Sequence, residues 1–113
     1  SGDDKILGLK LKNTGTTDMT LRSMTVSWTN NSTRKLKEIR IGNKTVWSYV
    51  GPGSPTGLQP SGNTVQIQSV LLKAGTTTNI DKIEFDGKMH GSSFTITFTM
   101  SDGTSVTITT PVL

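Results

Sequence analysis

Cysteine is absent from this chain of 113 residues. A disulfide framework, a thiolate metal site and a cysteine nucleophile are therefore excluded. Helix formers are also scarce, with one alanine (Ala74) and two glutamates (Glu38 and Glu84). No run of apolar residues approaches the roughly 18 that a membrane-spanning helix needs. These absences favour a small all-β domain without covalent or thiolate-metal cross-links.

Histidine occurs once, as His90, which the pattern places in a turn. A general base needs a positioned partner, and neither Ser92 nor Ser93 lies in a Gly-x-Ser-x-Gly elbow. The sequence therefore predicts a protein that is not an enzyme and that uses no cofactor.

Carboxylates gather around one expected strand, at Asp81, Glu84 and Asp86. They could approach a hard cation, but they do not have the spacing of an EF-hand loop. Alternation places Glu84 and Asp86 on the face opposite Ile83 and Phe85, as expected of a solvated sheet surface. We therefore predict no metal site.

Threonine, serine and glycine are abundant, and apolar residues alternate with them. Branching at Cβ suits threonine to a pleated, half-buried surface. Alternation bounded by turn residues predicts strands over residues 7–11, 19–28, 36–41, 44–50, 64–72, 78–85, 94–100 and 106–108. Within 19–28 the apolar residues change from odd-numbered to even-numbered positions, which predicts a bulge near Arg22-Ser23. The expected fold is one immunoglobulin-like β-sandwich of about seven or eight antiparallel strands over residues 5–113.

The chain begins Ser1-Gly2 without methionine. This start predicts that residues 1–4 are a remnant of tag cleavage or a disordered leader. The native start is then unknown, and a membrane segment upstream is compatible with it.

The segment 51–63 (GPGSPTGLQPSGN) contains three of the four prolines. Proline cannot supply ladder hydrogen bonds, so this segment is expected to be the longest loop. Loops of this length are usually functional or mobile. We expect it to contact partners through Gly51, Pro52, Pro55, Leu58 and Pro60.

Trp47 and Tyr49 have the same parity on one expected strand. Exposed together, their rings would form a platform for a sugar, and the chain would be a carbohydrate-binding module of a secreted enzyme. A core position is the alternative for Trp47. Sequons place candidate glycosylation sites at Asn30, Asn31 and Asn43, all in expected loops or turns.

A basic stretch runs from Arg34 to Lys44 in a chain of net charge +4. No aromatic residue lies within it, whereas nucleic-acid surfaces usually interleave aromatics with cations. Lysines on strands also protect sheet edges from pairing with other chains. Nucleic acid is therefore not the expected partner, although an anion-binding site stays open as a lesser alternative.

Several segments resemble the ectodomains of type IV pilin-like surface proteins of bacteria and archaea, and the archaellum accessory proteins are similar. The resemblance lies in residues 24–28 (MTVSW), 36–42 (LKEIRIG), 45–47 (TVW), 89–98 (MHGSSFTITF) and 101–103 (SDG). It implies a β-rich head outside the cell, on an N-terminal membrane helix that lies upstream of Ser1. No functional residues of the family carry over.

From this resemblance we expect a non-catalytic structural or adhesive ectodomain of a cell-surface filament, located extracellularly or at the cell surface. Its partners would be filament subunits, further copies of itself or cell-envelope components.

Overall fold

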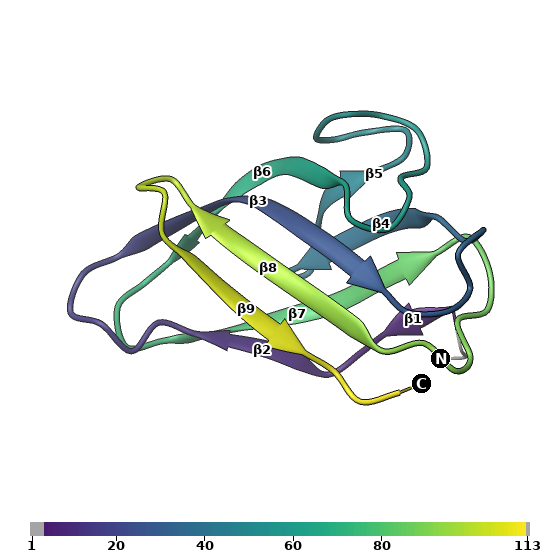
Figure 1. Ribbon diagram of the computed structural model, residues 1–113. Helices are drawn as coiled ribbons and strands as arrows, with labels where there is room; N and C mark the ends of the chain where they lie inside the picture. The colour runs from purple at the N-terminus through teal and green to yellow at the C-terminus, as the bar shows by residue number, and fades with distance from the viewer. Residues whose placement is uncertain (1–3, 113) are drawn as a thin grey trace.

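The computed structural model describes residues 4–112, which fold into nine strands and no helix (Figure 1). The strands are β1 (Lys5–Ile6), β2 (Leu9–Lys12), β3 (Met19–Trp28), β4 (Leu36–Ile41), β5 (Lys44–Ser48), β6 (Thr64–Leu72), β7 (Thr77–Phe85), β8 (Phe94–Met100) and β9 (Ser105–Thr109). None of the described residues forms a helix with the length and apolarity that crossing a bilayer requires.

The strands form two antiparallel sheets that pack face to face (Figure 1). Sheet A has the order β1-β7-β4-β5, and β2 also pairs with β7. Sheet B has the order β6-β3-β8-β9. The predicted all-β sandwich is confirmed. Because β2 and β3 lie in different sheets, the likeness to an immunoglobulin domain is one of architecture and not of strand order.

The first expected strand, 7–11, is observed as β2, and the short strand β1 precedes it. Gly8 lies between the two, and its φ of +80° lies in the left-handed region that favours glycine. Both strands pair with β7, one after the other. The additional β1 makes nine strands where about eight were expected.

Shifts of register at bulges set which side chains face the core, and two of them show how. The register of β3 shifts between Leu21 and Ser23 against both of its neighbours, as the change of parity predicts. A second shift, between Ile39 and Arg40, makes Val46 an extra residue in β5. Val46 and Trp47 are consequently both buried although they are adjacent in sequence.

The core lies between the sheets and is built from alternate residues of both. Phe85, the last residue of β7, links the two sheets near one end of the core, edge-to-face with Trp28 at 5.1 Å and stacked on Phe94 at 5.2 Å. Aromatic pairs in these arrangements stabilise a core by about 0.5–1.5 kcal/mol beyond the burial of their surface. The core is thin, so single large side chains contribute much of its stability.

Residues 1–3, part of the expected leader, lie outside the described residues, as does Leu113. Asp4 is described, and its carbonyl accepts a hydrogen bond from the Phe85 N–H at 2.8 Å.

Candidate interaction surface

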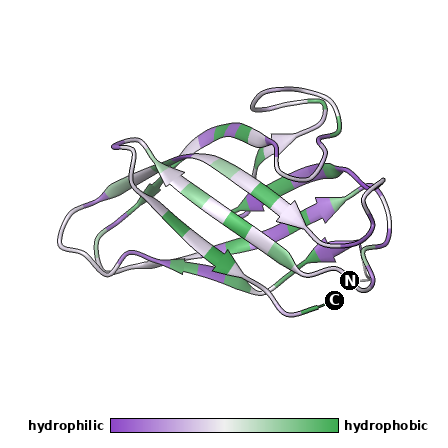
Figure 2. Ribbon diagram, in the orientation of Figure 1, coloured by the Kyte–Doolittle hydropathy of each residue, from purple (hydrophilic) through white to green (hydrophobic). Residues whose placement is uncertain are grey.

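The two sheets differ sharply in charge. The strands of sheet A contain ten charged residues among them, whereas the strands of sheet B contain only Arg22. Figure 2 shows a related contrast in hydropathy, because β8 and β9 are white and green while strands of sheet A carry purple segments. One broad face of the molecule is therefore almost free of charge.

A row of four threonines crosses this uncharged face from β6 to β9. Thr64 lies opposite Thr25, Thr25 opposite Thr97, and Thr97 opposite Thr107. Hydroxyl oxygens are 2.6 Å apart in the first pair and 3.2 Å apart in the last. Cross-strand threonine pairs of this kind stabilise a sheet. The row ends at Thr107, on the edge strand.

Strand β9 is an edge strand whose second side is open. At its two ends, Thr110 donates its N–H to the Phe94 carbonyl at 2.9 Å, and Thr104 accepts from Met100 at 2.8 Å. Alternate residues of an antiparallel strand direct their backbone groups to the same neighbour. Ser105, Thr107 and Thr109 therefore direct theirs away from β8.

The turn before β9 is held by Asp102. Its carboxylate accepts hydrogen bonds from the Thr104 hydroxyl at 2.6 Å and the Thr104 N–H at 2.9 Å. These bonds, the hydroxyl bond first, hold the pKa of the Asp102 carboxyl below its ordinary value. The turn that presents β9 is thereby fixed in one geometry.

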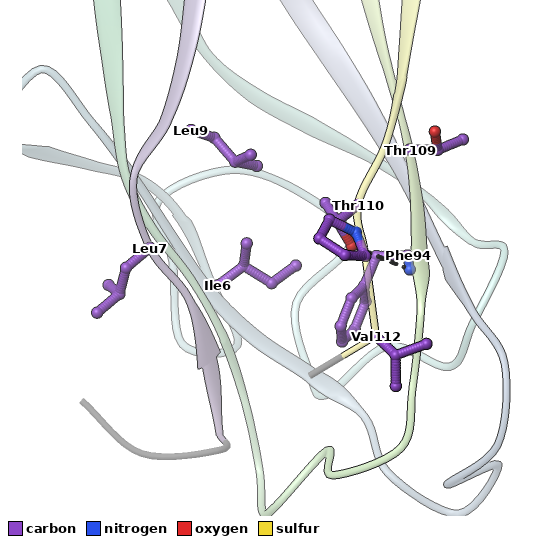
Figure 3. A pocket seen from close by; sticks show the side chains of 8 residues that line it. Ile6, Leu7, Leu9, Phe94, Thr109, Thr110 and Val112 are labelled. Atoms are coloured by element: carbon purple, nitrogen blue, oxygen red, sulfur yellow. Dashed lines mark hydrogen bonds between the residues drawn. The ribbon is translucent and has the colours of Figure 1, made fainter.

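The side of the sandwich between β2 and β9 is also open, because no ladder of the described residues joins these two strands. A hollow of about 200 Å³ lies at one end, between β1, β2 and the residues that follow β9 (Figure 3). Ile6 and Leu9 point into it, whereas Leu7 points away. A second hollow of about 200 Å³ lies at the other end, where Leu11, Met19 and Val106 are among its lining residues.

These hollows leave apolar side chains in contact with solvent. Val106 on β9 lines the second hollow and is 46% exposed, and Val112 beyond it lines the first and is 64% exposed. Ile108, between them in sequence, packs against the core and is half-buried. An uncharged strand edge beside exposed apolar side chains is a surface on which another chain can add.

The outer face of sheet A carries an ion-pair network instead. Glu38 and Glu84 lie directly opposite each other in the ladder, and Lys82 is close to both, at 3.6 and 2.8 Å. The hydrogen bond to Glu84, with the charge of Glu38, raises the pKa of the Lys82 ammonium although partial burial opposes the shift. Without this lysine the two glutamates would repel each other across the strands.

Replacing Lys82 with glutamine should lower the free energy of unfolding at neutral pH by about 1 kcal/mol. Since the folded protein holds the pKa of Lys82 above its ordinary 10.5, the stabilisation is complete below that value. It is lost as the pH rises through the higher pKa of the folded state. Urea denaturation of both proteins across this range measures the difference.

Lys88→Gln is the control, because Lys88 is exposed and lies in the loop after β7. We expect its stability to follow that of the unaltered protein at every pH. If K82Q loses stability at high pH as steeply as the unaltered protein, Lys82 is not the group responsible.

The segment 51–63 is a folded part of the sandwich. It protrudes between β5 and β6 in Figure 1, yet backbone bonds tie it to four strands, β3, β4, β5 and β6. Gln59 exchanges bonds with Leu36 at 3.1 and 2.7 Å, and Ser54 exchanges bonds with Gln66 at 2.9 and 2.6 Å. Of the residues predicted to make contacts, Pro55, Leu58 and Pro60 are exposed, and Gly51 and Pro52 are half-buried.

The prediction that Trp47 and Tyr49 form a sugar platform is wrong. Trp47 is completely buried, and its Nε1–H donates to the Pro55 carbonyl at 3.1 Å. Tyr49 lies beyond the end of β5 and is 40% exposed, with the Lys37 ammonium 5.9 Å from its ring centre. A single tyrosine cannot form the two-ring platform that parity suggested.

The three sequons differ in how their asparagines are used. The Asn31 amide donates to the His90 carbonyl at 2.9 Å and the Ser92 hydroxyl at 2.7 Å, and the Asn30 amide donates to the Gly91 carbonyl at 2.9 Å. Asn43 is exposed in the β4–β5 turn, where its backbone N–H makes the bond to Asp81. A glycan replaces one hydrogen of the side-chain amide. Asn31 uses its amide to donate two hydrogen bonds, so glycosylation would remove one of them.

In a host that glycosylates asparagine, we expect a glycan on Asn43 and none on Asn31. Intact-mass analysis of N43Q should show the loss of one glycan mass, because an occupied site is removed. The matched variant N31Q should keep the glycan. If N31Q loses the glycan and N43Q keeps it, the assignment is contradicted.

Each of the three carboxylates expected around this strand has a different partner. Asp81 accepts from the Asn43 N–H, Glu84 binds Lys82, and Asp86 accepts from the Lys35 N–H at 2.9 Å. The described residues contain no group of three potential ligands placed to hold a metal ion. His90 is exposed in the turn before β8.

Sequence reasoning did not identify β9 as an open edge. Alternation located the strand, but the order of strands within a sheet depends on pairings between distant residues. The available signal was the uncharged stretch from Phe94 to Val112, interrupted only by Asp102. Exposed edges usually carry lysine, and β2 and β5 do so here.

Comparisons of this chain with protein-family models, with curated proteins and with solved structures give no match.

Proposed function

We propose that this chain is a non-enzymatic structural or adhesive domain of a cell-surface filament or of a protein attached to one. It acts through protein–protein contacts outside the cell, and a hydrophobic helix upstream of Ser1 anchors it. The resemblance to pilin-like ectodomains in residues 24–28, 36–42, 45–47, 89–98 and 101–103 supports this reading.

The observation that carries the proposal is the open edge of β9. Its outward backbone groups are unprotected by charge, and apolar hollows adjoin it. Monomeric proteins usually protect such an edge with lysine, proline or a bulge, because it pairs readily with other chains. An edge of this kind lets a domain assemble by strand addition.

The segment 51–63 provides a second contact surface in this proposal. Leu58, Tyr49 and Val50 are exposed near one another, because the Gly57 N–H binds the Tyr49 carbonyl at 2.7 Å. The backbone bonds of the segment hold these side chains in place, so a partner would meet a preformed surface.

Immunogold labelling of intact cells of the source organism, with antibody raised against this domain, tests the proposal. We expect gold particles along surface filaments or at their bases. Labelling that appears only after the cells are broken would overturn it. The complete gene gives a second test, since the proposal fails if no hydrophobic segment precedes Ser1.

A further inference from the structure

We infer that two copies of this chain join along β9, antiparallel and centred on Thr107, so that their B sheets become one continuous sheet. This inference rests on the proposed function and names its partner as a second copy. Four features of β9 and its surroundings carry it.

The first feature is the direction of the backbone groups. Ser105, Thr107 and Thr109 direct theirs away from β8, as the bonds at Thr104 and Thr110 establish. When two such strands pair antiparallel about Thr107, Thr107 of one copy faces Thr107 of the other. Ser105 then faces Thr109 of the second copy. Each facing pair exchanges two bonds, about six in all.

The second feature is that the strand is complementary to itself. In this register the hydroxyl side chains of Ser105, Thr107 and Thr109 meet one another on the outer face, and Val106 meets Ile108 of the second copy on the inner face. The threonine row that ends at Thr107 then continues into the second copy. A slip of one residue would place hydroxyls against apolar side chains, so the register is specified.

The third feature is charge. The chain has a net charge of +4, so two copies repel each other over most of their surfaces. The edges of sheet A carry Lys10 and Lys12 on β2 and Lys44 on β5. Strand β9 carries no charge, so here two copies can approach without opposing like charges.

The fourth feature is that the other edge of sheet B is partly occupied. Ser54 pairs with Gln66 on β6, through bonds of 2.9 and 2.6 Å, and so covers part of that strand. No residue in 4–112 pairs with the outer side of β9, and its Val106 is 46% exposed. Pairing would place Val106 against an isoleucine instead of water, which favours association.

Sedimentation and light scattering over micromolar to millimolar concentrations measure the dimer directly. We expect a dimer of twice the 12.1 kDa mass of one chain. The fraction of dimer should rise with protein concentration, and no larger species should form. Thr107→Lys places like charges at the two-fold axis and should weaken dimerisation at least about tenfold. Thr95→Lys is the matched control, because Thr95 is exposed on the same face of β8, away from the edge, and should not weaken it.

The register has its own test. Mixing T107K with T107E should restore a dimer, because opposite charges then face each other. The chain has no cysteine, so T107C should form a disulfide between copies, since facing residues are about 5.5 Å apart at Cα and disulfides span this distance. T95C should not.

A protein that stays monomeric at millimolar concentration overturns the inference, as does a dimer that T107K leaves intact or a T95C disulfide that forms as fast as T107C. None of these outcomes touches the proposed function, which depends on labelling at the cell surface. Absence of surface labelling with an intact β9 dimer would overturn the proposed function and leave the dimer standing.

Discussion

Replacing Trp47 with alanine will lower the free energy of unfolding by about 3–5 kcal/mol. The indole ring is completely buried between the sheet and the segment 51–63. Its removal leaves a cavity that the surrounding strands cannot fill, and it leaves the Pro55 carbonyl without the Nε1–H donor at 3.1 Å. Urea denaturation followed by far-ultraviolet circular dichroism measures the loss.

Tyr49→Ala is the matched control, two residues along the chain. Tyr49 is 40% exposed, so its replacement should cost less than about 1 kcal/mol. Near-equal small losses in both variants would place Trp47 at the surface and would restore the two-ring platform as an interpretation.

Replacing Gly53 with alanine will lower the free energy of unfolding by about 3 kcal/mol or more. A Cβ at this position would lie 2.6 Å from the Gln66 carbonyl oxygen and 2.6 Å from Cδ1 of Trp47, so either the backbone or the buried ring must move. The φ of +85° is also unfavourable for any residue with a side chain. Thermal unfolding followed by circular dichroism measures the effect as a lower midpoint.

Gly57→Ala separates the two causes. Gly57 has nearly the same φ, +89°, but no atom lies within 4 Å of a Cβ there. Only the unfavourable φ then acts against alanine, and we expect the free energy of unfolding to fall by about 1–2 kcal/mol. If Gly53→Ala and Gly57→Ala lose the same amount, close packing of the segment 51–63 on Trp47 does not contribute.

These variants bear on how the segment 51–63 works. Its proline and glycine content correctly predicts a long loop, and loops of that kind are often mobile. Contacts with Trp47, Gln66 and Leu36 instead make this one part of the fold. If it binds a partner, it does so without a large loss of conformational entropy.

Most strands could be predicted from sequence because alternation is a local signal. The apolar residues of 94–100 recur at every second position, and the strand begins and ends where the pattern does. The bulge in β3 could also be predicted, because one extra residue within a strand is what moves the apolar side chains from one parity to the other.

The position of Trp47 could not be predicted in the same way. Its parity with Tyr49 holds only in a regular strand, and the bulge opposite Ile39 and the end of β5 at Ser48 both interrupt that regularity. Neither feature leaves a mark in the local pattern, because both depend on how β4 and the segment 51–63 pack against β5.

Composition and a period of two are enough to establish that the chain is all-β, lacks thiol chemistry and has its charges and threonines largely on different strands. The burial of Trp47, the gathering of the uncharged strands into one sheet and the position of β9 at its edge emerge only when the chain is folded. The physical reason is that strand order and edge exposure arise from pairings between residues far apart in the chain. Alternation within a strand does not specify which strand will be its neighbour.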